Sequence, residues 1–161
     1  PPGAAPRPPA APVPVAAGPS AVERPDGPTV PALARQTLPL LARSQLAPAS
    51  GARRGAYTRY EHLGGSALPS GIIIATGSEV HLALAAAQRL AEAGVAIRLV
   101  SMPSWELFEA QSAEYRESVL PRAVRARVSV EAAASFGWSR YTGDAGANIS
   151  IDHFGASAPA E

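Results

Sequence analysis

The stretch from Gly71 to Met102 constrains the fold more than any other part of this chain. It opens with GIIIATG, a short run rich in β-branched residues and closed by glycine, which is typical of a strand buried on both faces. A second apolar run, Ala96 to Met102, follows about one helix length later. Two buried strands joined by one helix run parallel, because the helix returns the chain to the end from which it started. The stretch therefore predicts a βαβ unit.

The helix between these strands has recognisable signals at both ends. Ser78 is expected to cap its N-terminus and Gly94 to stop its C-terminus. The turn from Thr76 to Val80 lies where α/β proteins bind anions, but a single glycine and the acidic Glu79 favour capping over ligand binding. The apolar side of this helix is predicted from residues at helical spacing: Val80, Leu82, Leu84, Ala87, Leu90 and Ala91.

The rest of the chain continues to alternate strands with helices. WELFEAQ, after Pro103 and Ser104, and AEYRESVL, before Pro121, predict two short helices. Further strands are predicted at Ala126 to Ala132 and Asn148 to Phe154, with an edge strand at Gly55 to Glu61. This order predicts an α/β fold: a three-layer α/β/α sandwich with a mostly parallel sheet of about five strands.

The N-terminal part differs in composition from the α/β part. Residues 1–31 combine frequent proline with alanine and glycine, so they offer few side chains to bury and few backbone donors. We expect a mostly disordered or polyproline-like head, for which a linker or an altered reading frame is favoured over an SH3-type ligand. The expected division is a head at 1–31, a connecting segment at 32–54 and one α/β domain at 55–161.

Composition excludes several classes of function. Fourteen arginines face thirteen acidic residues, which leaves a net charge of +1 and makes a nucleic-acid partner unexpected. The chain has no cysteine, so disulfides and thiolate metal sites are excluded, which fits a reducing cytosol. No apolar run is long enough to span a bilayer and no export signal is recognised, so we expect a cytoplasmic protein without membrane contact.

Few residues suggest chemistry by themselves. His62, His81 and His153 have no paired spacing, so a metal site is not expected. Asp152 and His153 are adjacent, which favours a polar pair at a strand end or in a loop over a proton relay. Gly143–Asp144 could suggest the start of a metal-binding motif, but the asparagine that would complete such a motif is missing. The larger aromatic residues are interpreted as packing residues, with a subunit interface as an alternative: Trp105, Phe108, Tyr115, Trp138 and Tyr141.

Four collinear stretches resemble the transketolase family. They are RPDGPTVPALARQTLPLL, then GIIIATGSEVHLALAAAQRLAEAGVAIRLVSMPSWELFEAQ, then AEYRESVLPRAVRARVSVEA, then FGWSRYTGDAGANISIDHFGASAP. Each has a counterpart in the family, and SMPSWELF favours transketolase over related thiamine enzymes. The resemblance begins at Asp26 and implies the end of the pyrimidine-binding domain followed by most of the C-terminal domain.

The resemblance implies an activity for the whole enzyme. Transketolases transfer a two-carbon ketol unit between sugar phosphates in the pentose phosphate pathway and the Calvin cycle, as homodimers that use thiamine diphosphate and a divalent metal, Mg²⁺. The family residues that bind cofactor and metal precede this region, so we expect no catalytic, cofactor or metal residue here, and a packing or dimer-contact role. Arg35 matches the family arginine that grips the sugar phosphate, a task suited to a planar, permanently charged guanidinium.

Departures from the family leave other hypotheses open. Residues 1–20 do not resemble the family, and the family continues beyond the position of Glu161 through a further helix that packs on the sheet. Both ends are therefore interpreted as truncated or altered. One alternative is a stand-alone module that binds a small anion at the Thr76 turn. Another is one half of a split thiamine enzyme, whose cofactor domains lie on a separate chain.

Overall fold

The computed structural model describes residues 18–19, 21–23, 27–32, 37–38 and 46–155. Most of the predicted head lies outside these residues, so its disorder stays a prediction. Within the head, Glu23 is described and forms an ion pair with Arg53. Arg35 also lies outside the described residues.

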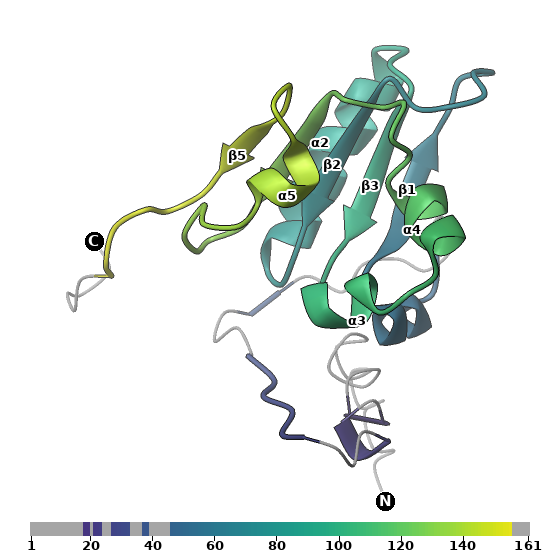
Figure 1. Cartoon of the computed structure of the whole chain (residues 1–161). Helices are drawn as coiled ribbons and strands as arrows, with labels where there is room; N and C mark the ends of the chain where they lie inside the picture. The colour runs from purple at the N-terminus through teal and green to yellow at the C-terminus, as the bar shows by residue number, and fades with distance from the viewer. Residues whose placement is uncertain (1–17, 20, 24–26, 33–36, 39–45, 156–161) are drawn as a thin grey trace, which may run out of the picture.

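One five-stranded sheet forms the centre of the molecule, with strand order β1-β3-β2-β4-β5. Only β1 runs antiparallel, on β3; the other pairs are parallel. The predicted mostly parallel sheet is thus confirmed, with β3, β2 and β4 side by side at its centre (Figure 1). The strands are β1 (Tyr57–His62), β2 (Gly71–Ala75), β3 (Ile97–Ser101), β4 (Arg127–Val130) and β5 (Ala147–Ile149).

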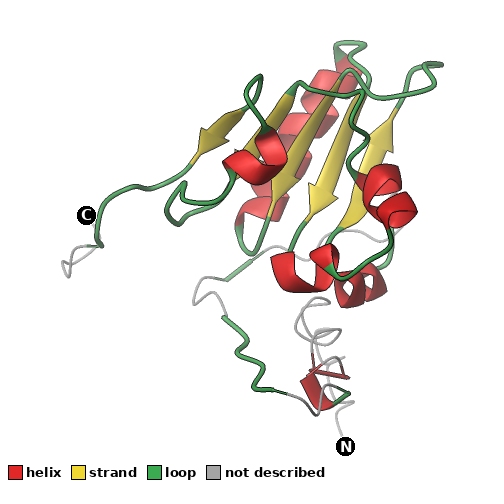
Figure 2. Cartoon of the chain, in the orientation of Figure 1, coloured by secondary structure: helices red, strands yellow, loops and turns green. Residues whose placement is uncertain are grey.

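Helices cover both faces of this sheet (Figure 2). Helix α2 (Glu79–Glu92) lies behind the sheet in Figure 1, and the shorter helices lie in front of it or at its lower end. These are the 3₁₀ helix η2 (Ala49–Arg54), α3 (Trp105–Glu109), α4 (Ala113–Val119) and α5 (Ser139–Thr142). The predicted three-layer sandwich is confirmed.

Alternation along β2 divides the core into two layers. Ile73 and Ala75 face α2, whereas Ile72 and Ile74 face the shorter helices, because successive strand residues point to opposite faces. The first layer is completed by Ala83, Leu84, Ala87, Ile97 and Leu99. The second contains Ala56, Val100, Met102, Phe108, Val119, Leu120, Val124, Trp138 and Tyr141. Both faces of β2 are therefore buried, as its unbroken apolar run predicts.

The C-terminus of α2 forms as predicted from the sequence, but its N-terminus does not. Gly94 adopts φ +80°, and the amides of Val95 and Gly94 donate to the carbonyls of Leu90 and Ala91 at 2.9 Å each, a Schellman motif. Ser78 was expected to cap the helix, but it already has helical dihedral angles and makes no side-chain cap. Its hydroxyl instead donates to the Glu79 carboxylate at 2.6 Å.

Two residues expected on the apolar side of α2 are exposed. Leu82 is 57% exposed and Leu90 is 38% exposed. The buried face of the helix follows positions 80, 83, 84, 87 and 91, the spacing of one helical stripe, and residues 82 and 90 lie beside that stripe. Ala83, which was not predicted to face the core, is buried instead.

The predicted last strand is too long. Asn148 to Phe154 was expected, whereas β5 ends at Ile149 because its neighbour β4 ends at Val130 and provides no further ladder. Beyond that point, Ile151 donates its amide to the carbonyl of Ala133 at 2.9 Å, and the chain continues as a loop. Within the described part of the chain, no helix is long and apolar enough to cross a bilayer.

Candidate functional site

The candidate site is a crevice at the carboxyl ends of the central strands. From β2 the chain passes through α2 to β3 on one side, and from β4 it passes through α5 to β5 on the other. The crevice between β2 and β4 is therefore the topological switch point of the sheet, where open parallel sheets bind ligands. Thr76, Met102 and Glu131 line it, and each lies directly after the end of one strand.

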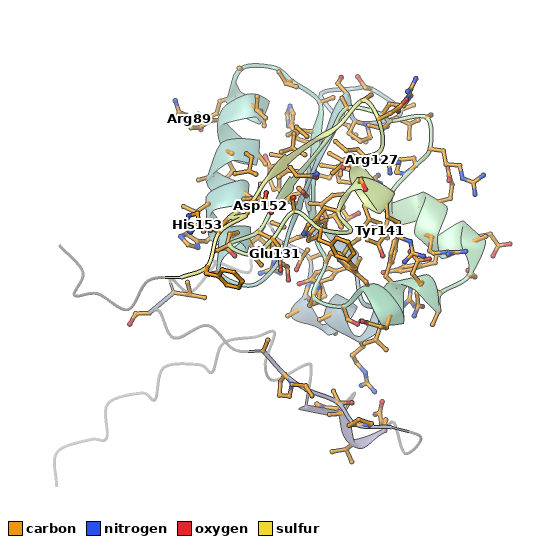
Figure 3. The ribbon with its side chains drawn as sticks, turned by 60° about the vertical axis from the view of Figure 1, so that its left-hand side comes forward. Arg89, Arg127, Glu131, Tyr141, Asp152 and His153 are labelled. Atoms are coloured by element: carbon orange, nitrogen blue, oxygen red, sulfur yellow. The ribbon has the colours of Figure 1, made fainter. Side chains whose placement is uncertain are left out.

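The crevice has a volume of about 270 Å³ and combines acidic, hydroxyl and aromatic groups. Trp138 donates its indole N–H to Glu131 Oε2 at 2.6 Å, and Ser104 donates its hydroxyl to Glu106 Oε2 at 3.0 Å. Glu131 is labelled in Figure 3 at the end of β4. The described residues that line it are Thr76, Met102, Pro103, Ser104, Trp105, Glu106, Glu131 and Trp138.

A short segment with a capped helix forms one wall of the crevice. Ser104 has extended dihedral angles and accepts the Leu107 amide on its side chain at 3.2 Å, so it is a true N-cap of α3. Its own amide donates to the carbonyl of Gly55 at 3.0 Å. These bonds fix Trp105 and Glu106, the first residues of α3, at the mouth of the crevice.

Aromatic rings in edge-to-face and tilted contacts form part of this wall. Trp105 meets Trp138 edge to face, with 5.1 Å between ring centroids, and Trp138 is only 1% exposed. Tyr141 lies 5.5 Å from Trp105 and 6.1 Å from Trp138. Phe108 and Tyr115 also form a ring pair, at 6.4 Å. The prediction that these aromatic residues pack is confirmed, and two of them, Trp105 and Trp138, line the crevice.

Tyr141 links this aromatic cluster to a charged network. Its hydroxyl donates to Glu109 Oε1 at 3.0 Å, and Arg116 donates to the other oxygen of Glu109 at 2.8 Å. Burial, reinforced by the neighbouring Glu109 carboxylate, raises the pKa of Tyr141 to about 12. Tyrosinate at this position would be both desolvated and repelled.

This raised pKa predicts a loss of stability in alkali. Between pH 10 and 12 the folded state keeps the Tyr141 proton while the unfolded chain releases it, so the stabilisation is complete below pH 10 and is lost as the pH rises through 12. In urea unfolding, we expect the native chain to lose up to about 1.4 kcal/mol per pH unit more than Tyr141→Phe over this range. Parallel pH profiles would contradict the assignment.

The structure does not bring together the other residues that the sequence analysis discussed. Asp152 accepts the Ser135 amide at 2.7 Å and His153 contacts its neighbour's carbonyl, so they form no relay and are a loop pair, as predicted. Both follow β5 in Figure 3. Asp144 pairs with Arg125 at 2.6 Å, which lowers its pKa. In the described ranges, no three His, Cys, Asp or Glu side chains converge as a metal site would need.

Sequence reasoning missed the two carboxylates of the crevice, Glu131 and Glu106, and the short helix α5. Glu131 directly follows a predicted strand, and this position was a signal that could have placed it at the carboxyl edge of the sheet. Glu106 gave no such signal, because its place depends on how α3 packs. Tyr141 lies in α5 and Trp138 is its N-cap, and no helix was predicted from the sequence at this position.

Comparison with known proteins agrees with this architecture. Residues 55–161 match the family model described as the transketolase-like TK C-terminal domain. The chain is 48% identical over 134 residues to the chloroplastic transketolase of Solanum tuberosum, covering 83% of this chain and 18% of that protein. It is 47% identical over 141 residues to the transketolase of Staphylococcus aureus strain MW2, covering 88% and 21%.

Solved structures give the same result. The crystal structure of the Pichia stipitis transketolase in complex with sedoheptulose 7-phosphate superposes with a TM-score of 0.63 at 38% identity, covering 76% of this chain and 17% of that one. The chain therefore belongs to the transketolase family and is homologous to its C-terminal region. It spans about a fifth of the length of the curated relatives that it matches.

Proposed function

We propose that this chain supplies the C-terminal domain of a transketolase, which transfers a two-carbon ketol unit between sugar phosphates. The observation that carries this proposal is the identity of 47% over 141 residues to a transketolase, confined to about a fifth of that protein. The chain's own part in this reaction is packing and dimer contact, and bond making belongs to other domains.

Thiamine diphosphate and Mg²⁺ are the cofactors of the proposed whole enzyme. When bound, thiamine diphosphate supplies the carbanion chemistry, and the protein supplies position and charge. The family residues that bind thiamine diphosphate and the metal precede the region that this chain resembles, so we assign both cofactors to other domains of the enzyme. We assign Arg35 to the sugar phosphate, with its guanidinium donating paired hydrogen bonds to phosphate oxygens.

A domain exchange tests this function. In the transketolase of Geobacillus stearothermophilus, which is 45% identical over 141 residues, the matching region is replaced by this chain. We expect the chimera to form sedoheptulose 7-phosphate from xylulose 5-phosphate and ribose 5-phosphate with thiamine diphosphate and Mg²⁺. The isolated chain is expected to give none under the same conditions.

Two controls make this result decisive. The parental enzyme without its C-terminal region shows what the exchange restores, and circular dichroism shows whether the chimera folds. A folded chimera without turnover would contradict the proposal, and turnover by the isolated chain would contradict its division of labour. Adding the isolated chain to the shortened parent also tests the split-enzyme alternative, which predicts recovery of turnover from two separate chains.

The alternative of an anion-binding module finds little support at the crevice. Glu106 and Glu131 line it, and Glu79 lies in the first turn of α2 beside the Thr76 turn. Three carboxylates so placed oppose an anion.

A further inference from the structure

A groove lies at the amino ends of the strands, on the edge of the sheet opposite the crevice. Leu68 lies in the loop that leads into β2, Arg98 is the second residue of β3, and Pro121 follows α4; all three line this groove. Its volume of about 500 Å³ lies within the range usual for small-molecule sites. The groove shares none of its described lining residues with the crevice.

Arg98 lines this groove as a buried cation that is only 8% exposed. Its Nε donates to Glu61 Oε1 at 2.6 Å, and its Nη1 donates to the carbonyl oxygens of Ser118 and Val119 at 2.6 and 2.8 Å. Both carbonyls belong to the last turn of α4, where a helix has no amide donor of its own to offer them. These bonds fix the Arg98 guanidinium between β1 and α4.

The remaining nitrogen of this guanidinium is an unused donor. A guanidinium has five N–H groups, and the bonds to Glu61, Ser118 and Val119 use only those of Nε and Nη1, so Nη2 donates to no described residue. Within the described part of the chain, Ser150 Oγ is the one side-chain atom that is both fully buried and unpaired. Nη2 is therefore accessible, and we infer that it faces the groove that Arg98 lines.

The surface around Arg98 selects a ligand with an apolar body. Leu68, Pro121 and Ala123 give the groove apolar walls, and Leu68 is 44% exposed. An apolar side chain so exposed gains by contact with an apolar ligand. One side of α4 forms the remaining wall, with Glu114, Glu117 and Ser118.

The donor selects the polar group of that ligand. Nη2 requires a hydrogen-bond acceptor, but Glu61 already offsets the charge of Arg98 at close range. A second carboxylate would give up its water for a cation that is already paired, so a neutral acceptor is favoured. The carbonyl oxygen of an amide is a strong neutral acceptor with two lone pairs.

We propose that this groove binds a small neutral molecule that carries an amide carbonyl on an apolar body. The carbonyl oxygen accepts from Arg98 Nη2, and the apolar body packs on Leu68, Pro121 and Ala123. Such a site goes beyond ketol transfer and does not depend on it, because its test measures binding to this chain alone.

Nuclear magnetic resonance of the full, ¹⁵N-labelled chain provides a site-specific test. Titration with N,N-dimethylcyclohexanecarboxamide should shift the amide signals of Leu68 and Ala123 and the Nε–H signal of Arg98. We expect these shifts to saturate with a dissociation constant of about 1 mM, the weak affinity of a fragment-sized ligand. The indole signals of Trp105 and Trp138, which line the crevice at the other edge, should not move.

Three further probes test the chemistry of the ligand. Methyl cyclohexanecarboxylate has a similar shape and a weaker carbonyl acceptor, so we expect it to bind about fivefold more weakly. Cyclohexanecarboxylate should bind no more tightly than the amide. N-acetylleucine methylamide represents a polypeptide segment and should bind more weakly, because its two N–H groups lose water on entry.

Variants locate the binding. Ala123→Phe fills the groove from an exposed position and should weaken binding at least fivefold, whereas Ala86→Phe, at an exposed position of α2 on the other face of the sheet, should bind like the native chain. Arg98→Lys keeps a cation for Glu61 but removes Nη2, so we expect it to bind the amide and the ester equally. Circular dichroism identifies any variant that fails to fold, and Ala123→Phe decides the site if Arg98→Lys does.

Distinct outcomes would overturn the proposal. An absence of saturable shifts at the groove, or a folded Ala123→Phe that binds like the native chain, would contradict the site. Equal binding of amide and ester by the native chain, or a preference that survives in folded Arg98→Lys, would contradict the role of Nη2. Tighter binding of the carboxylate or of the peptide probe would contradict the assignment to a small neutral amide.

Discussion

Arg127→Met is expected to lower the free energy of unfolding by about 3 kcal/mol or more, because it leaves several main-chain carbonyls without a donor. The Arg127 guanidinium donates to Val124, Tyr141 and Pro121 at 2.8 Å each and to Leu120 at 3.2 Å. It thereby ties the loop after α4 to the last turn of α5, beside the start of β4. Burial lowers the pKa of Arg127, and the four carbonyl oxygens hold its guanidinium group in position by hydrogen bonds.

Urea unfolding of the full chain measures this effect, and Arg125→Met is the matched control. Arg125 lies two residues earlier and its exposed side chain pairs with the exposed Asp144, so its loss should change the midpoint little. Arg127→Lys should fall between the two, since one ammonium cannot satisfy four spread acceptors. Equal midpoints for Arg127→Met and Arg125→Met would show that the carbonyl cluster contributes nothing.

Gly55→Ala is expected to destabilise the domain by about 3 kcal/mol or more, or to prevent folding. Gly55 has φ +82°, and a Cβ atom there would lie 2.2 Å from the Phe108 amide nitrogen and 2.4 Å from the Ser104 carbonyl oxygen. Both are backbone atoms of the segment that bears Trp105 and Glu106, so neither can yield without moving the wall of the crevice.

Gly94→Ala separates the cost of the left-handed backbone angle from the cost of the steric clash. Gly94 has a nearly equal angle, φ +80°, but no atom lies within 4 Å of its added Cβ. Only the cost of the left-handed conformation remains, about 1 kcal/mol. Unfolding curves should therefore place Gly94→Ala close to the native chain and Gly55→Ala far below it. Similar losses for both variants would mean that the contact with α3 is not a constraint.

The parts of the fold that depend on local sequence were predictable. The β2-α2-β3 unit and the stop at Gly94 follow from apolar runs, helical spacing and one glycine, all within 31 neighbouring residues from Gly71 to Ser101. The errors occurred where contact with a neighbouring strand or sheet face determines the structure. The end of β5 depends on the end of β4, and the exposure of Leu82 depends on which stripe of α2 meets the sheet.

The candidate site was less predictable than the fold. Glu131, Glu106 and the two tryptophans are brought together from three segments, and no spacing in the sequence links them. Their meeting depends on strand order, which places β4 beside β2 although α2, β3, α3 and α4 lie between them in the chain. The one residue carried over from the family resemblance, Arg35, lies outside the described residues, so its role stays a proposal.

The two outer strands of the sheet differ in a way that bears on self-association. β1 carries a bulge between Thr58 and Tyr60, and at its outer side Ala47 donates its amide to the Arg59 carbonyl at 3.1 Å. β5 is only three residues long. Bulges, covering segments and short edges are the means by which natural sheets avoid templating a neighbour's strand, so this sheet is poorly suited to growing into an amyloid-like stack.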